Sequence, residues 1–160
     1  MGRVVSGRAG ADGKLTTAKR KLYWQPGWLK QHDRLMTAIH AMPGRIPLVM
    51  SGDLHAVGIG RMLRSGKLDF AANPINAVLT GPIGTGRGWP SARRGTGALP
   101  PAHLDMDERV KPIEQHGFTI ADFSPDKIVL RMFKWDVKTQ SVDAIDTLEP
   151  FHTAELTRAR

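Results

Sequence analysis

The chain has 160 residues, 41% of them hydrophobic, which is enough for one domain with a real core. It contains no cysteine, so disulfides, zinc-thiolate clusters and thiol nucleophiles are excluded, and any metal must bind to His, Asp, Glu, Asn or backbone oxygen. The formal net charge of +8 suits either nucleic acid or an anionic phosphate substrate, and therefore does not separate these two partners.

Residues 1–22 are rich in Gly, Lys and Arg and show no apolar period that would place them in a core. We therefore expect a flexible basic segment here, followed by one folded part over residues 23–160. A basic arm that contacts nucleic acid is the alternative, and it is disfavoured because aromatic residues are not interleaved and no recognised motif is present. No apolar run is long enough to span a bilayer, and the first residues lack the apolar segment of a signal peptide, so the compartment stays open.

A helix and a buried strand are predicted next along the chain. Apolar residues recur at helical spacing from about Leu29 to Ala41, and Pro43-Gly44 then ends the helix. The apolar run 46–50 is typical of a strand that is covered on both faces, and Ser51-Gly52 ends it. The chain therefore enters its most distinctive motif directly from a strand.

Asp53 and His55 follow this strand in the sequence Gly-Asp-Leu-His. In open α/β sheets the ligand crevice lies beyond the carboxyl ends of the strands, so a carboxylate and an imidazole placed there can converge on one ion or substrate. Two residues of ligand type are too few to define a metal site. In the structural alternative, Asp53 caps the following segment and His55 is a hydrogen-bonded histidine without a chemical role.

The middle of the chain is predicted to contain a second strand and a glycine-rich loop. Residues 56–63 can continue as a short helix or turn, although their two glycines weaken that prediction. Ile75–Thr80 indicates a second buried strand, which runs straight into the glycine-rich stretch 81–90. We expect this strand and the strand at 46–50 to lie in one sheet. Such a loop can bring backbone N–H groups close to an anion, with Arg87 beside them, but it lacks the Lys-Ser/Thr of a phosphate-binding Walker loop. An ordinary surface loop is the alternative.

The last third of the chain contains the clearest structural unit of the sequence. Residues 103–115 have an acidic start and can hold a helix, which Pro112 would interrupt. Two strand-like runs over 117–123 and 128–135 flank Ser-Pro-Asp-Lys, which predicts an antiparallel hairpin. Residues 143–148 are expected to add a strand before a polar, frayed C-terminus.

Three motifs occur in a fixed order: Ser-Gly-Asp-Leu-His, the glycine-rich loop ending in Gly-Trp-Pro-Ser, and Gly-Phe-Thr-Ile-Ala-Asp-Phe-Ser-Pro-Asp. In this order the chain resembles the C-terminal half of the alkaline phosphatase D-like family, a branch of the calcineurin-like metallophosphoesterases. The resemblance covers roughly Tyr23 to the end of the chain. It implies an α/β fold that forms one half of an α/β/β/α metallophosphoesterase-type sandwich, with a C-terminal antiparallel hairpin.

The resemblance implies metal-dependent hydrolysis of phosphomonoesters or phosphodiesters. Asp53 and His55 align with the family's metal-ligand motif, His55 with a catalytic role, and the ions would be Ca, Fe, Mn or Zn. Arg87 would contact the substrate phosphate, an assignment from its charge and position in the loop. The upstream metal-binding motifs of the family are not in the chain, so we expect a fragment that a missing N-terminal half completes. Half a sandwich exposes apolar surface, which predicts self-association; a small basic nucleic-acid-binding module and an inactive remnant are the alternatives.

Overall fold

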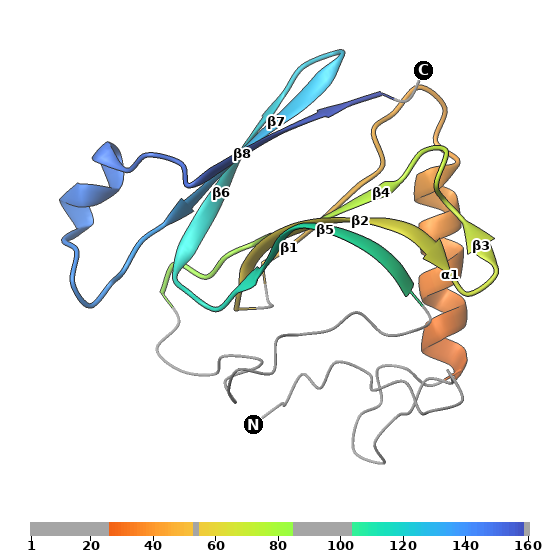
Figure 1. Ribbon diagram of the computed structural model, residues 1–160, viewed down its shortest axis with the longest axis horizontal. Coiled ribbons are helices and arrows are strands. Elements are labelled where there is room, and N and C mark those ends of the chain that lie inside the picture. Colours follow the sequence, from red (N-terminus) through yellow and green to blue (C-terminus); the bar gives the residue numbers. More distant parts are fainter. Residues whose placement is uncertain (1–25, 53–54, 85–103, 159–160) are drawn as a thin grey trace.

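The computed structural model describes residues 26–52, 55–84 and 104–158, which form one α-helix, a short 3-10 helix and two β-sheets (Figure 1). This composition confirms a mixed α/β chain, built mostly of strands. The predicted sandwich of the metallophosphoesterase type stays a prediction. The elements in chain order are α1 (Pro26–His40), β1 (Leu48–Ser51), β2 (Val57–Ser65), β3 (Leu68–Asp69), β4 (Ile75–Thr80), β5 (Leu104–Ile113), β6 (Gly117–Phe123), β7 (Lys127–Lys134), the 3-10 helix (Val142–Thr147) and β8 (His152–Thr157).

The first sheet has five strands in the order β1-β4-β2-β3, with β5 also paired to β2. β1 and β4 run parallel, in a register that places Ser51 opposite Leu79. β2 is antiparallel to β3, β4 and β5, and its pairing with β5 shifts register at three places. Such irregularities bend a strand pair and increase its twist, which accounts for the curl of this sheet in Figure 1. The prediction that the strands at 46–50 and Ile75–Thr80 share one sheet is confirmed.

The second sheet has three antiparallel strands in the order β6-β7-β8. β6 and β7 form the predicted hairpin, with Gly117 opposite Lys134 and Phe123 opposite Ile128. The side chain of Ser124 closes the turn, because its hydroxyl donates to the carbonyl oxygen of Lys127 at 2.9 Å. The hairpin is therefore confirmed, and it belongs to a sheet of its own that β8 completes.

The first sheet is covered on both faces by different partners. Val57, Ile59 and Val78 form one cluster with residues of β7 and β8, whereas Met62 and Ile75 form another with Met36 of α1. Within β2 and within β4, the residues of one cluster are separated from those of the other by an odd number of positions. Their side chains therefore point to opposite faces of the sheet. The order of layers is therefore α1, the first sheet, then the second sheet, whose strands cross those of the first (Figure 1).

The short helix or turn predicted for residues 56–63 and the helix predicted for residues 103–115 are both strands, so these predictions are wrong. Residues 57–65 form β2, in which Gly58 and Gly60 allow the β5 backbone to approach closely. An added Cβ on Gly58 would lie 3.1 Å from the carbonyl oxygen of Val110, and one on Gly60 would lie 3.3 Å from the carbonyl oxygen of Asp107. Residues 104–113 form β5, which pairs only with β2 and is therefore an edge strand. Pro112 lies at a register shift of that edge, where a strand tolerates proline.

The prediction for the last twenty residues is also wrong in two respects. Residues 142–147 form a 3-10 helix, not a strand. The final strand is β8, which lies in the stretch expected to fray, with Ala154 and Leu156 buried and Thr153 and Glu155 exposed. This alternation buries one face of β8 against the first sheet, which explains why so polar a segment is ordered.

Some predictions fall outside the described residues: the basic segment 1–22, Asp53, and the part of the glycine-rich loop that holds Arg87. Within the described ranges, no helix is long and apolar enough to cross a membrane.

A partly buried hydrogen bond attaches α1 to the first sheet. The hydroxyl of Ser65, which is 1% exposed, donates to Oδ1 of Asp33 at 2.7 Å. Ser65→Ala would leave this carboxylate oxygen without that donor, and we expect it to lower the free energy of unfolding by about 1–2 kcal/mol. Urea denaturation measures the change. Ser141→Ala is the control, because Ser141 is exposed and its side chain makes no capping hydrogen bond; a similar loss in both variants would contradict the prediction.

Candidate functional site at the ends of β1 and β4

The parallel strands β1 and β4 end side by side, and each is followed by a glycine. Ser51 is the last residue of β1 and lies opposite Leu79. The hydroxyl of Thr80 donates to the carbonyl oxygen of Ser51 at 3.2 Å, which joins the two strand ends. Gly52 and Gly81 then begin the two loops. Both strands therefore leave the sheet at the same edge. Parallel α/β sheets place their ligand sites at this position, beyond the carboxyl ends of the strands.

His55 lies at this same edge of the sheet. It is half-buried, and the fully buried Ala56 and Val57 follow it directly. Val57 begins β2 and pairs with Thr80 at the end of β4. His55 is therefore only two residues from a position that is aligned with the end of β4. Asp53 and Arg87 lie outside the described residues, so the predicted convergence of Asp53 and His55 on one ligand stays a prediction.

The connection between β5 and β6 forms another wall of this edge. The backbone N–H of Gly117 donates to the carbonyl oxygen of Pro82 at 3.0 Å. The hydroxyl of Thr119 donates to the carbonyl oxygen of Thr80 at 3.3 Å. An added Cβ on Gly81 would lie 2.6 Å from the carbonyl oxygen of Gly117. Contacts that involve the backbone thus hold the segment before β6 against the end of β4. The sequence did not predict that these two segments lie together.

His116 belongs to this connection and was not selected from the sequence. It is 7% exposed, and its carbonyl oxygen accepts a hydrogen bond from the backbone N–H of Trp135 at 3.0 Å. The pKa of Asp136 is lowered from its usual value because the backbone N–H of Lys138 donates to its carboxylate at 2.9 Å, with the Thr139 side chain adding to the effect and His116 contributing least. Only the His-Gly pair before the hairpin could have marked His116 in the sequence.

The described residues alone do not fit a complete metal centre. Among residues 26–52, 55–84 and 104–158, no group of three or more His, Cys, Asp or Glu side chains is placed to hold an ion. His55 is a competent ligand type for Zn, Mn or Fe. A metal site at this edge would therefore need Asp53 and further groups in addition to His55.

Comparison with known proteins does not extend this assignment. No protein-family model matches the chain, and no curated protein or solved structure matches it either. The fold and the site define a strand-rich α/β protein with a candidate ligand-binding edge at the carboxyl ends of a parallel strand pair.

Proposed function

We propose that the chain takes part in metal-dependent phosphoester hydrolysis, at the edge where β1 and β4 end, as the C-terminal half of an alkaline phosphatase D-like enzyme. Sequence supports the proposal through the order of three motifs: Gly-Asp-Leu-His, the glycine-rich loop and the β6–β7 hairpin. The observation that carries it is the position of His55, beside the aligned ends of two parallel strands. Metal ligands of phosphoesterases need such a convergence, because the ions must reach one phosphate together.

The proposal assigns His55 a role as a metal ligand, with Asp53 as its neighbour in the motif. Thr80 and Gly81 hold the loop from β4 beside it: the Thr80 hydroxyl fixes the spacing to β1, and the glycine allows the chain to turn at φ +91°. The remaining ligands would come from outside the described residues. Arg87 would contact the phosphate, as its charge suggests.

The test is hydrolysis of p-nitrophenyl phosphate and bis-p-nitrophenyl phosphate by the purified chain, with Mn, Zn, Ca or Fe added, together with metal binding by calorimetry. His55→Ala is expected to weaken metal affinity by at least about tenfold and to lower turnover in parallel. His152→Ala is the matched control, because this half-buried histidine lies on β8 in the second sheet. A folded chain that binds none of these metals, or whose affinity is indifferent to His55, would refute the proposal.

A further inference from the structure

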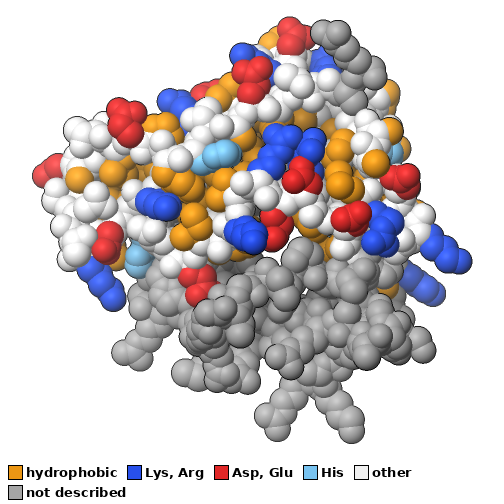
Figure 2. Space-filling model, in the orientation of Figure 1, with side chains coloured by type: hydrophobic (Ala, Val, Ile, Leu, Met, Phe, Trp, Pro, Cys, Tyr) orange, Lys and Arg blue, Asp and Glu red, His pale blue; other side chains and the backbone are white. Residues whose placement is uncertain are grey.

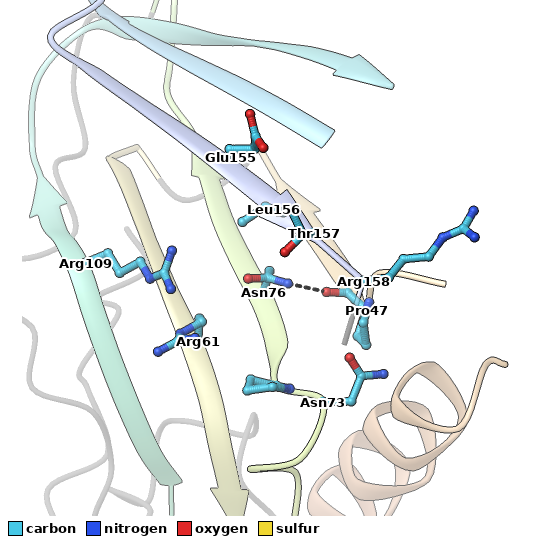
Figure 3. Close-up of a pocket in the computed structure, with 10 residues that line it drawn as sticks. Pro47, Arg61, Asn73, Asn76, Arg109, Glu155, Leu156, Thr157 and Arg158 are labelled. Carbon is cyan, nitrogen blue, oxygen red and sulfur yellow. Dashed lines mark hydrogen bonds between the residues drawn. The ribbon is translucent and has the colours of Figure 1, made fainter. Parts of the chain in front are cut away.

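A polar cavity lies apart from the strand ends just described. It has a volume of about 230 Å³ and lies between the face of the first sheet and the C-terminal end of β8 (Figure 3). Pockets that enclose a drug-sized ligand are about 300 Å³ or larger, so this cavity can enclose only part of such a molecule, and the rest of the ligand would extend into solvent. The polar lining of the cavity includes Arg61, Asn76, Arg109, Glu155 and Arg158.

Two arginines from neighbouring strands share one carboxylate at the wall of the cavity. Nε and Nη2 of Arg61 on β2 both donate to Oδ2 of Asp107, at 3.0 and 2.6 Å. Nε of Arg109 on β5 is 4.0 Å from the same oxygen, which is too long for a hydrogen bond. Arg61 is therefore fixed by its partner, whereas the N–H groups of Arg109 have no hydrogen-bond acceptor within the described part of the chain. Such a guanidinium can bind an anion with two parallel hydrogen bonds.

The net charge around the cavity is positive. Glu155 lines it, but its Oε2 is paired with Nζ of Lys127 at 2.8 Å, and it therefore opposes an anion only weakly. In Figure 2, basic and acidic side chains lie next to one another near the middle of the face that is drawn. The guanidinium groups of Arg61 and Arg109 share the single carboxylate of Asp107, which leaves one positive charge in excess. The Arg158 side chain adds nothing to this excess, because it points away from the cavity in Figure 3 and donates to the carbonyl oxygen of Pro125.

Asn76 adds a fixed acceptor to this basic wall. Its side chain is 6% exposed, and its Nδ2 donates to the carbonyl oxygen of Pro47 at 2.9 Å. This bond turns Oδ1 toward the arginines, as Figure 3 shows. A ligand that meets both Arg109 and Asn76 would carry an anionic group and, next to it, a hydroxyl or amine donor.

The geometry points to a binding site for the phosphate group of a small phosphomonoester, an anion that suits the positively charged wall formed by Arg61 and Arg109. The guanidinium of Arg109 donates to the phosphate oxygens, and Asn76 accepts from a hydroxyl of the same molecule. Asn76 and Thr80 are four residues apart on β4, which at about 3.3 Å per residue separates this cavity from the strand-end site by roughly 13 Å. The phosphomonoester site is thus distinct from the proposed hydrolytic site.

Calorimetric titration of the whole chain with AMP, in EDTA to remove metal ions, tests this assignment. Arg109→Gln is expected to raise the dissociation constant for AMP at least about tenfold, because one charge-assisted contact is lost. Arg34→Gln removes the same charge from the exposed face of α1 and is expected to change it less than twofold. Equal affinities in wild type and Arg109→Gln, or no saturable binding by the wild type, would overturn the proposal.

Further variants separate the alternatives. Glu155→Gln removes the carboxylate of the cavity wall and is expected to tighten AMP binding, a gain that damage to the fold cannot produce. His55→Ala is expected to leave AMP binding unchanged; loss of binding in this variant would assign AMP to the strand-end site and overturn the assignment to the cavity. Citrate is expected to bind more weakly than AMP, and a citrate affinity that equals that of AMP and depends equally on Arg109 would overturn the choice of phosphate.

Discussion

Replacing Gly81 with alanine is expected to lower the free energy of unfolding by roughly 2–5 kcal/mol. Two independent effects add at this position. Gly81 has φ +91°, a backbone conformation that L-residues with a side chain rarely adopt. An added Cβ would also lie 2.6 Å from the carbonyl oxygen of Gly117 and 2.7 Å from Cγ2 of Val57. The first of these neighbours is backbone and the second is a fully buried side chain, so neither can move away cheaply.

Gly84→Ala is the matched control, since an added Cβ there meets nothing within 4 Å and the residue lies in the same loop. We expect its effect on the midpoint of urea denaturation to be small, within about 0.5 kcal/mol. Equal losses from the two variants would show that β4 and the β5–β6 connection do not approach each other as described. The comparison therefore tests the packing that holds the strand-end site together.

Local sequence patterns predicted the helices and strands whose apolar spacing or turn residues are visible in their own segment of sequence. The helix α1 and the hairpin β6–β7 follow from apolar spacing and turn residues, and the strands β1 and β4 follow from short apolar runs. β2 was not predicted, because its glycines favour neither a helix nor a strand in the local sequence. Their role becomes visible only where the backbone of β5 packs against them. β5 carries a period-two signal in Leu104 and Met106, but the neighbouring Asp105 and Asp107 also suit the start of a helix. β8 offers only Ala154 and Leu156 as apolar residues on its buried face.

Some features of the candidate site could also be predicted from the sequence, and others could not. The position of His55 beyond a buried strand followed from the sequence, as did the presence of Ile75–Thr80 in the same sheet. The proximity of Gly117 to Gly81 did not, because it depends on how β5 returns the chain to the end of β4. The pairing of Arg61 with Asp107 required the register between β2 and β5, which two wrongly predicted helices concealed. Contacts between distant segments are thus the information that local patterns lack.

Leu130→Ala is expected to lower the free energy of unfolding by about 3–5 kcal/mol, near the upper end for a buried leucine. Leu130 is 0% exposed and belongs to the cluster that joins the two sheets. Its cross-strand neighbours on β6 and β8 are both alanines, Ala121 and Ala154. Because these short side chains cannot extend into the space left by the leucine, the cavity would persist, and persisting cavities give the largest losses.

Phe123→Ala on β6 provides the control, because Phe123 is 67% exposed and its truncation is expected to change the free energy of unfolding by less than about 1 kcal/mol. Urea denaturation followed by circular dichroism measures both variants. A loss below about 1.5 kcal/mol for Leu130→Ala would contradict the placement of Leu130 between the sheets. If the loss is large and the transition stays single, the three-stranded sheet unfolds together with the first sheet, because they share one core. The strand-end site and the phosphomonoester site would then depend on the same cooperative unit, since β2 and β4 contribute residues to both.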